Sequence, residues 1–307
     1  MKNLSFARRA LFTLALATLA PALPLAAAQN SEEFRVSVGA GHRFDANIDN
    51  HGGEFNETRV SLSATREFKI NDRWKLDPFL SYRFSAYDFS QGEPWDEVHA
   101  ARATVLLQYA LNEKWAVFGG PTVGFAADDD ADFDKAFTFG GAVGAIYRVN
   151  ERLAIGAGVG VTTELEDNAR IRPAIIVKWR INDHWSAESG YFEVAGSGGP
   201  GVEIRYHFNE RWSLAGGAQY HETRFRLADY RNPFPSGRRH FERVGEDTSL
   251  PVYLKAHWQA NQNIGVEAGV GVSLGGELRI DGEDGHKIYR EDYDPAPFAG
   301  VRAVFTF

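Results

Sequence analysis

A short polar corner recurs six times in the chain and constrains the fold more than any other feature. In each copy an aromatic residue stands three positions before an Asn, an apolar residue directly before it, and Trp, Leu or Ile three positions after it. The Asn residues are Asn71, Asn112, Asn150, Asn182, Asn209 and Asn261. Asn tolerates left-handed backbone and hydrogen-bonds within its own turn. Each corner therefore predicts a tight reversal between two strands.

The segments beside these corners alternate strictly between two kinds of residue. From Ile264 to Leu274 one face is apolar and the other carries Gly, Glu and Ser, and Leu250 to Ala260 repeats the pattern. The same alternation covers residues 101–111, 153–161, 171–181 and 202–208. A period of two with one apolar face predicts β-strands.

The spacing between successive corners is irregular, which excludes repeat folds of constant period such as solenoids and propellers. Constant short corners with variable segments between them are typical of a barrel that has short turns at one end and loops of varied length at the other.

The alternation alone also fits a soluble antiparallel sheet with one buried face. Aromatic residues favour a membrane barrel instead. Six of the seven Trp stand on the apolar face beside the corners, as expected for a girdle at a membrane interface: Trp74, Trp115, Trp179, Trp185, Trp212 and Trp258. A second aromatic group follows about ten residues further along several strands, the distance that spans an apolar band of about 25 Å. It includes Tyr82, Phe125, Phe139, Tyr191 and Tyr220.

The last seven residues alternate apolar positions and end on Phe305 and Phe307. This ending resembles the C-terminal assembly signal of single-chain outer-membrane β-barrels of Gram-negative bacteria. The resemblance implies a porin-like class of protein in the outer membrane. It also implies a lipid bilayer and lipopolysaccharide as surroundings, and recognition of the last strand by the outer-membrane assembly machinery.

We therefore predict an all-β fold, a closed antiparallel transmembrane β-barrel over residues 29–307 with short periplasmic turns and longer extracellular loops. The corners give about fourteen strands, and twelve or sixteen stay open if one segment is misassigned. Closure is required because lipid cannot satisfy an open sheet edge. The predicted outer loops are 45–56, 86–97, 126–134, 164–168, 196–200, 228–246 and 276–294. For 228–246, an inward constriction and a surface loop are both open.

Residues 1–28 read as a cleaved secretory signal peptide. Lys2, Arg8 and Arg9 precede an apolar run, and Ala26 to Ala28 supply small residues at the cleavage site. The chain has no Cys, which excludes a disulfide framework and thiolate chemistry. The formal net charge of −8 argues against nucleic acid as a partner. We predict no cofactor and no metal.

The polar faces of the strands are expected to line the interior, and they are rich in basic side chains. The predicted pore-lining residues are Arg35, Arg83, Arg102, Arg148, Arg172, Lys178, Arg180, Arg205, Lys255 and Arg302. Interior acids are expected to be fewer, namely Glu67, Asp77, Glu188, Glu203 and Glu267. Inner-face Gly residues such as Gly217, Gly265 and Gly269 are expected to leave space.

A basic, water-filled lumen predicts a passive porin-like channel for small polar solutes, with a preference for anions. The alternative is that these cations pair with interior carboxylates, which gives a structural or surface-binding barrel with a closed lumen. Both interpretations stay open.

A hydrolase is the enzymatic alternative to a non-enzymatic barrel. His184-Trp-Ser186 resembles the His-x-Ser of outer-membrane phospholipases, although it lies in a corner where a turn residue is expected. His207, His221 and His257 are expected to face the lumen near Glu188 and Glu203. Two interpretations are open: a proton-transfer cluster, or the scattered polar residues that are normal in a wet lumen.

Overall fold

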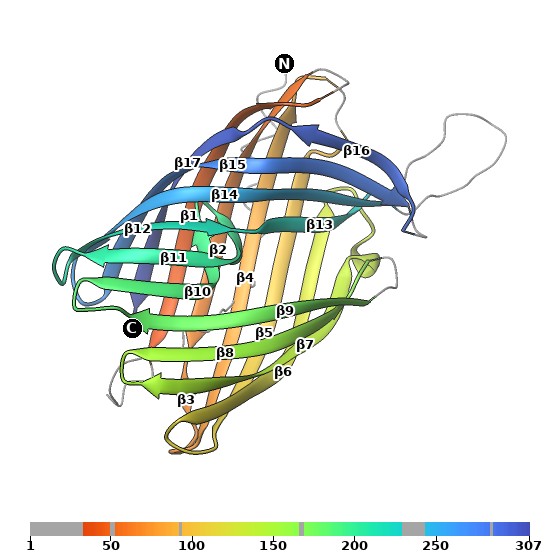
Figure 1. Ribbon diagram of the computed structural model, residues 1–307. Coiled ribbons are helices and arrows are strands. Elements are labelled where there is room, and N and C mark those ends of the chain that lie inside the picture. Colours follow the sequence, from red (N-terminus) through yellow and green to blue (C-terminus); the bar gives the residue numbers. More distant parts are fainter. Residues whose placement is uncertain (1–32, 50–52, 92–93, 166–168, 229–242, 283–284) are drawn as a thin grey trace.

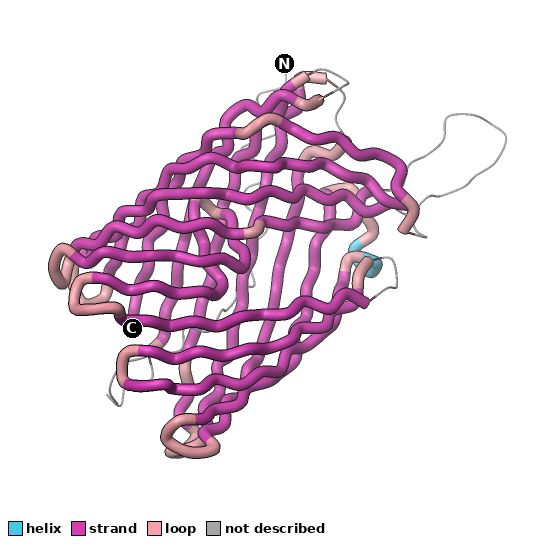
Figure 2. The backbone as a smooth tube through the Cα atoms, in the orientation of Figure 1, coloured by secondary structure: helices cyan, strands magenta, loops and turns pink. Residues whose placement is uncertain are grey.

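Figures 1 and 2 show a computed structural model of the chain, which describes residues 33–49, 53–91, 94–165, 169–228, 243–282 and 285–307. The predicted signal peptide, residues 1–28, lies outside the described residues. No helix in these ranges is long and apolar enough to cross a membrane.

One antiparallel sheet closes on itself as a barrel (Figure 1). Its strands are β1 (Phe34–Asn47), β2 (Glu54–Arg66), β3 (Phe68–Lys69), β4 (Trp74–Phe89), β5 (Glu97–Ala110), β6 (Trp115–Asp128), β7 (Phe137–Asn150), β8 (Leu153–Thr163), β9 (Ala169–Arg180), β10 (Trp185–Val194), β11 (Ser197–His207), β12 (Trp212–Gln219), β13 (His221–Leu227), β14 (Arg243–Gln259), β15 (Ile264–Gly282), β16 (Lys287–Tyr293) and β17 (Ala296–Thr306). A single 3₁₀ turn, η1 (Phe133–Lys135), interrupts the strands of the described part.

The barrel has fourteen strands in the described residues, because β3, β13 and β17 each continue the strand before them. The first and last strands pair from Arg35 with Thr306 to Arg43 with Phe298, and this ladder closes the sheet. The predicted fold class and strand number are confirmed.

The Asn corners form the predicted tight turns. The side-chain oxygen of Asn71 accepts hydrogen bonds from the backbone N–H groups of Arg73 and Trp74, at 2.9 and 3.0 Å. Asn112 repeats both contacts with Lys114 and Trp115. Within each turn, backbone N–H groups cannot reach a carbonyl on a partner strand, and the Asn side chain accepts their hydrogen bonds instead. The residues of the turn alone are therefore sufficient to specify the reversal.

The alternation of the strands separates an outer apolar face from an inner polar one. On β14, Val252 and Leu254 are exposed to the surroundings of the barrel, whereas Tyr253 and Lys255 are buried inside it. By the rule for bacterial barrels, the end with the short turns is periplasmic and the opposite end is extracellular.

Several predicted outer loops are wrong because the strands continue past the apolar band. Most of 276–294 is paired strand, with Gly276 opposite Tyr293 in the β15–β16 ladder. Residues 243–246 open β14, while 229–242 lie outside the described residues. Strand pairing needs only backbone partners, so it does not stop where contact with lipid stops.

Candidate functional site

The barrel wall forks between β9 and β10. These strands pair only from Arg180 with Ser186 to Val177 with Ser189, whereas β9 pairs with β8 along its whole length. At the fork, the Ser189 hydroxyl accepts a hydrogen bond from the Val177 N–H and donates one to the Ile175 carbonyl, both at 2.8 Å. The Ser189 hydroxyl thus replaces the last backbone hydrogen bonds between β9 and β10. Beyond Ser189, β10 no longer pairs with β9 and departs from the barrel wall.

The hairpin of β10 and β11 turns into the barrel and its tip packs on three glycines of the inner wall. Gly41 on β1 pairs with Gly300 on β17, which pairs with Gly269 on β15, so they form a flat glycine patch. A methyl group on Gly41 or Gly300 would overlap the backbone of Ala195, and one on Gly269 would lie 2.7 Å from Val194 Cγ2. The patch is therefore a socket for the hairpin tip.

The prediction that residues 196–200 form an outer loop is wrong. Ala195 and Gly196 have φ angles of 50° and 73°, and strand pairing resumes at once from Val194 to Ser197. Two consecutive left-handed residues make the tight turn of a two-residue hairpin. In Figure 1, β10 and β11 end well short of β9 and β14. So narrow a hairpin fits inside the barrel, where its apolar tip is buried.

Polar and apolar contacts anchor this hairpin. The Glu193 carboxylate accepts a hydrogen bond from the Ser61 hydroxyl and lies 3.5 Å from the Arg302 guanidinium. Val194 and Ala195 form a buried apolar cluster with Tyr253 and Phe298. The hairpin is thus tied to β2, β14 and β17.

Two cavities lie on either side of the hairpin. The periplasmic cavity has a volume of about 410 Å³ and reaches Lys178, which also lines two further cavities at the short-turn end. The outer cavity has a volume of about 400 Å³ and lies against the inner wall of β5 to β9. Ser81, Arg83 and Tyr191 line both cavities and so form their boundary. The Arg102 guanidinium lies 6.0 Å from the Tyr191 ring centroid.

The periplasmic cavity carries more positive than negative side chains. Its charged lining is Arg35, Arg83, Lys178, Arg205, Lys255, Arg302, Glu188, Glu193, Glu203 and Glu267. Glu203 lies 3.0 Å from Lys255 and 2.6 Å from Arg205, and Glu267 lies 3.6 Å from Arg302. These ion pairs hold the charged side chains against the barrel wall. Because six cations and four acids line the cavity, its net charge is positive.

A buried aromatic cluster lies at the extracellular end of the barrel, with members on β1, β2, β4, β5, β13, β15, β16 and β17. Its members are Ala46, Phe55, Tyr87, Phe89, Trp95, Val98, Phe225, Leu227, Leu278, Ile280, Tyr293 and Ala296. Trp95 stands edge-on to Tyr87, Phe89 and Phe225, with ring centroids 5.8, 5.7 and 5.1 Å apart. This packing buries the side chains of the cluster almost completely.

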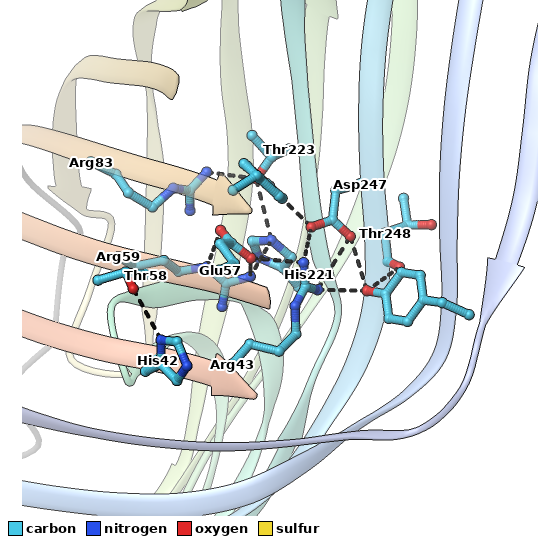
Figure 3. Close-up of polar contacts among 12 residues, drawn as sticks. His42, Arg43, Glu57, Thr58, Arg59, Arg83, His221, Thr223, Asp247 and Thr248 are labelled. Carbon is cyan, nitrogen blue, oxygen red and sulfur yellow. Dashed lines mark hydrogen bonds and ion pairs between the residues drawn. The ribbon is translucent and has the colours of Figure 1, made fainter. Parts of the chain in front are cut away.

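An ionic cluster adjoins the aromatic one and joins side chains of β1, β2, β14 and β16 (Figure 3). The buried Arg43 guanidinium lies 2.8 Å from Asp247 and 2.8 Å from Glu57, and it donates a hydrogen bond to the Tyr293 hydroxyl at 2.6 Å. It also stacks over the Phe55 ring at 4.7 Å. Buried charges are tolerated only when they are paired in this way.

Strand β13 closes the extracellular side of the outer cavity. It bridges to β6 through Arg226 and Ala127, and the Arg226 guanidinium donates hydrogen bonds to the carbonyls of Leu165 and Lys135. In the described residues, β13 therefore covers the outer cavity from the extracellular side.

The side of the outer cavity is less complete. We call the space between residues 170–175 of β9 and residues 220–224 at the start of β13 the side gap. Ion pairs and no backbone ladder connect the described strands there. Arg172 and Glu222 line the outer cavity and lie 2.7 Å apart. Ile171 and Ile175 of the free edge are 66% and 75% exposed. The wall thus has an unpaired edge beside a cavity.

Residues 72–302 match the family described as Domain of unknown function (DUF6268). The chain belongs to the DUF6268 family. No curated protein matches the sequence significantly.

Among solved structures, the DUF6268 chain is similar to the COG4313 outer membrane channel from Pseudomonas putida F1. The two share 13% identity and a TM-score of 0.50 over 91% of this chain and 97% of that one. A FadL homologue from Pseudomonas aeruginosa matches at 10% identity and a TM-score of 0.47 over 89% and 90%. The toluene transporter TodX from P. putida matches at 10% identity and 0.42 over 91% of each chain. At 13% identity the first likeness shows the fold, that of an outer-membrane β-barrel, which agrees with the predicted class.

The ten basic residues predicted to line a pore all line one of the cavities of this DUF6268 barrel. Arg172, Arg205, Lys255 and Arg302 form ion pairs with interior acids. Arg83 donates a hydrogen bond to Thr223 at 2.7 Å. Their part in permeation stays a prediction.

Several interior acids of the site were missed by sequence reasoning, among them Glu57, Glu193, Glu222 and Asp247. Glu57 carries a usable signal, because it alternates with Arg59 and Ser61 on the inner face of β2. Glu193 has no such signal. Both faces of the internal hairpin lie inside the barrel, so alternation of polar and apolar residues does not distinguish an inner face there.

The inner-face glycines do not simply leave space, so that prediction is corrected. A methyl group on Gly217 would lie 2.7 Å from the Tyr253 hydroxyl, and one on Gly265 would lie 3.0 Å from the His257 ring. Gly269 lies beneath the hairpin tip. Large neighbouring side chains occupy the room that these glycines provide.

The six Trp residues of the predicted girdle are 36–48% exposed and stand beside the short turns. Trp74 packs on Tyr109 and Trp115 on Tyr147, with ring centroids 4.5 and 4.8 Å apart. Phe305 pairs with Val36 on β1 and with Ile264 on β15, and Phe307 is 71% exposed. Contact with lipid headgroups and recognition by the assembly machinery stay predictions.

The residues of the hydrolase alternative are divided between the two ends of the barrel. His221 lies in the ionic cluster, 3.5 Å from Arg59. His257 lies near Glu267, and His207 near Ser186, where Nε2 and Oγ are 3.4 Å apart. His184 contacts a neighbouring backbone carbonyl from its turn. The three interior histidines therefore do not form one cluster.

Proposed function

We propose that the protein is a passive outer-membrane channel for small anionic solutes. The observation that carries this proposal is that the periplasmic and outer cavities share Ser81, Arg83 and Tyr191 as a common boundary. Two polar cavities in series across the hairpin supply a route from the periplasmic end of the barrel to β13, with Tyr191 as its constriction. A hydrolase is not proposed, because its candidate histidines are separated.

The charge of the lining supports a preference for anions. Six cations face four acids in the periplasmic cavity, and Arg83 and Arg102 flank Tyr191 at the boundary. Rings of positive side chains at a constriction favour anions over cations of the same size.

A second candidate is a channel for amphipathic anions that reach the outer cavity from the membrane. The side gap favours it, because Ile171 and Ile175 border a cavity that contains Arg172 and Arg224. A sheet edge at membrane depth is tolerated where it lines a water-filled cavity. Apolar surface outside and cations inside suit a molecule with an apolar part and an acidic group.

Conductance in planar bilayers tests the channel proposal. We expect discrete current steps and a reversal potential in a salt gradient that indicates a preference for chloride over potassium. Absence of discrete conductance would defeat the proposal and favour the alternative of a barrel with a closed lumen.

The two candidates differ in how the solute reaches the outer cavity. Because the natural chain has no Cys, Arg172→Cys and Glu222→Cys can be joined across the side gap by a short, reducible thiol cross-linker. If amphipathic anions use the gap, cross-linking will stop uptake of octanoate into proteoliposomes and reduction will restore it. Uptake of octanoate that is unchanged by cross-linking would remove the second candidate.

A further inference from the structure

Three side chains with metal-binding atoms meet on the outer face of the barrel near its extracellular rim. Glu97 and His99 lie on β5, and Asp129 follows β6 directly. One donor atom from each lies within 4.8 Å of the other two, and His99 Nε2 is 3.8 Å from Asp129 Oδ1. This is the one group of its kind among the described residues.

The backbone fixes the positions of these three residues. Val98 pairs with Asp128 in the β5–β6 ladder, and the Asp129 N–H donates a hydrogen bond to the Glu97 carbonyl at 3.0 Å. The chains that carry both carboxylates are therefore held side by side by the sheet itself.

The imidazole of His99 is oriented from the opposite side. Its Nδ1 lies 2.7 Å from the Tyr82 hydroxyl on β4, and its ring packs against Phe84 with centroids 5.2 Å apart. When Nδ1–H donates to Tyr82, the lone pair of Nε2 points toward the carboxylates. A ligand histidine held by a hydrogen bond on its other nitrogen is the usual arrangement in metal sites.

We propose that Glu97, His99 and Asp129 form a zinc site at the outer rim of the barrel, with one coordination position left open. Imidazole with two carboxylates suits Zn²⁺ better than Mg²⁺ or Ca²⁺, which prefer oxygen ligands. Zinc bonds of about 2.0–2.2 Å place tetrahedral ligands roughly 3.4 Å apart. Asp129, whose side chain is 44% exposed, can rotate to close this distance.

The site is independent of the channel. It lies on the outward face of β5, in register with the exposed Val105 and Leu107 rather than with the cavity-lining Arg102. Zinc there would clamp the outer ends of β5 and β6, and the open position would face the surroundings of the barrel.

Zinc binding to the purified full chain in detergent, without a polyhistidine tag, tests the proposal by calorimetric titration. We expect one saturable site that His99→Ala and Asp129→Asn abolish. Tyr82→Phe should weaken zinc binding by about 10- to 100-fold, because it removes the group that orients the imidazole.

His42→Ala is the matched control. His42 also lies on the outer face, with its Nδ1 3.0 Å from the Thr58 hydroxyl, and it belongs to no group of metal ligands in the described residues. The His42→Ala chain should bind zinc as the natural chain does. No binding by the natural chain, or equal binding by the His99→Ala chain, would overturn the proposal. Heat-modified migration on gels verifies that each variant is folded.

Discussion

The backbone of Ala195 lies directly on Gly41, although the two residues are far apart in the sequence. Gly41 and its ladder neighbours Gly300 and Gly269 present no side chains, so the hairpin tip can reach the backbone of the wall. This contact fixes the position of β10 and, with it, the Tyr191 ring between the two cavities.

Filling the glycine patch should displace the hairpin. Gly41→Val or Gly300→Val would place methyl groups where the Ala195 backbone lies. We expect a larger single-channel conductance, because the tip can no longer pack against β1 and β17. Gly160→Ala is the control, since its added methyl has contacts no closer than 3.8 Å. Equal conductance of the natural and Gly41→Val chains would contradict the assigned role of the patch.

Removing the ring at the cavity boundary should also widen the path. Tyr191→Ala leaves the hairpin anchored through Glu193 and Val194 but removes the aromatic ring among the three side chains that line both cavities. We expect higher conductance with weaker selectivity for anions, measured in planar bilayers. Tyr147→Ala, which alters only the ring beside Trp115 at the periplasmic girdle, should leave both properties unchanged.

Breaking the ionic cluster should destabilise the barrel. Asp247→Asn leaves the buried Arg43 with less negative charge beside it, and removal of one partner from a buried ion pair costs about 3–5 kcal/mol. Unfolding by urea in detergent measures this difference. Glu33→Gln removes the partner of the half-exposed Arg35 instead, and should cost less than about 1 kcal/mol. Similar stabilities of the two variants would show that water solvates the ionic cluster more than its burial indicates.

The hydroxyl at the fork should protect one backbone amide. Ser189→Ala removes the acceptor of the Val177 N–H and the donor to the Ile175 carbonyl. We expect faster hydrogen exchange in the peptide that contains Val177, because the last ladder contact of β9 is lost. Ser186→Ala on the same strand, whose hydroxyl contacts His207, is the control. Exchange that stays slow in the Ser189→Ala chain would mean that another group satisfies the amide.

Much of the fold follows from local sequence, as Asn71 and Asn112 illustrate. Each satisfies the backbone of its own turn through its own side chain, so the reversal needs no distant partner. The face of a strand is equally local, since Val252 and Lys255 differ in polarity and therefore in the side of the wall that they occupy.

The candidate site depends on partners that are distant in sequence. Arg43 and Asp247 are 204 positions apart in the sequence, and no local pattern around either residue predicts that they pair. Trp95 also lacks a local signal, because it is the one Trp away from an Asn corner and its partners come from β4 and β13.

The amino-acid sequence by itself determined that this chain is a closed barrel of about fourteen strands with its polar face inward. It did so because turn chemistry and alternating polarity act between near neighbours. Only the tertiary structure decided that β10 leaves the wall, that its tip meets the glycine patch, and that the aromatic and ionic clusters lie at the extracellular end. A polar inner face suits water, a carboxylate from another strand, or an inserted hairpin equally well. The choice among them depends on which strands the closed ladder brings opposite one another.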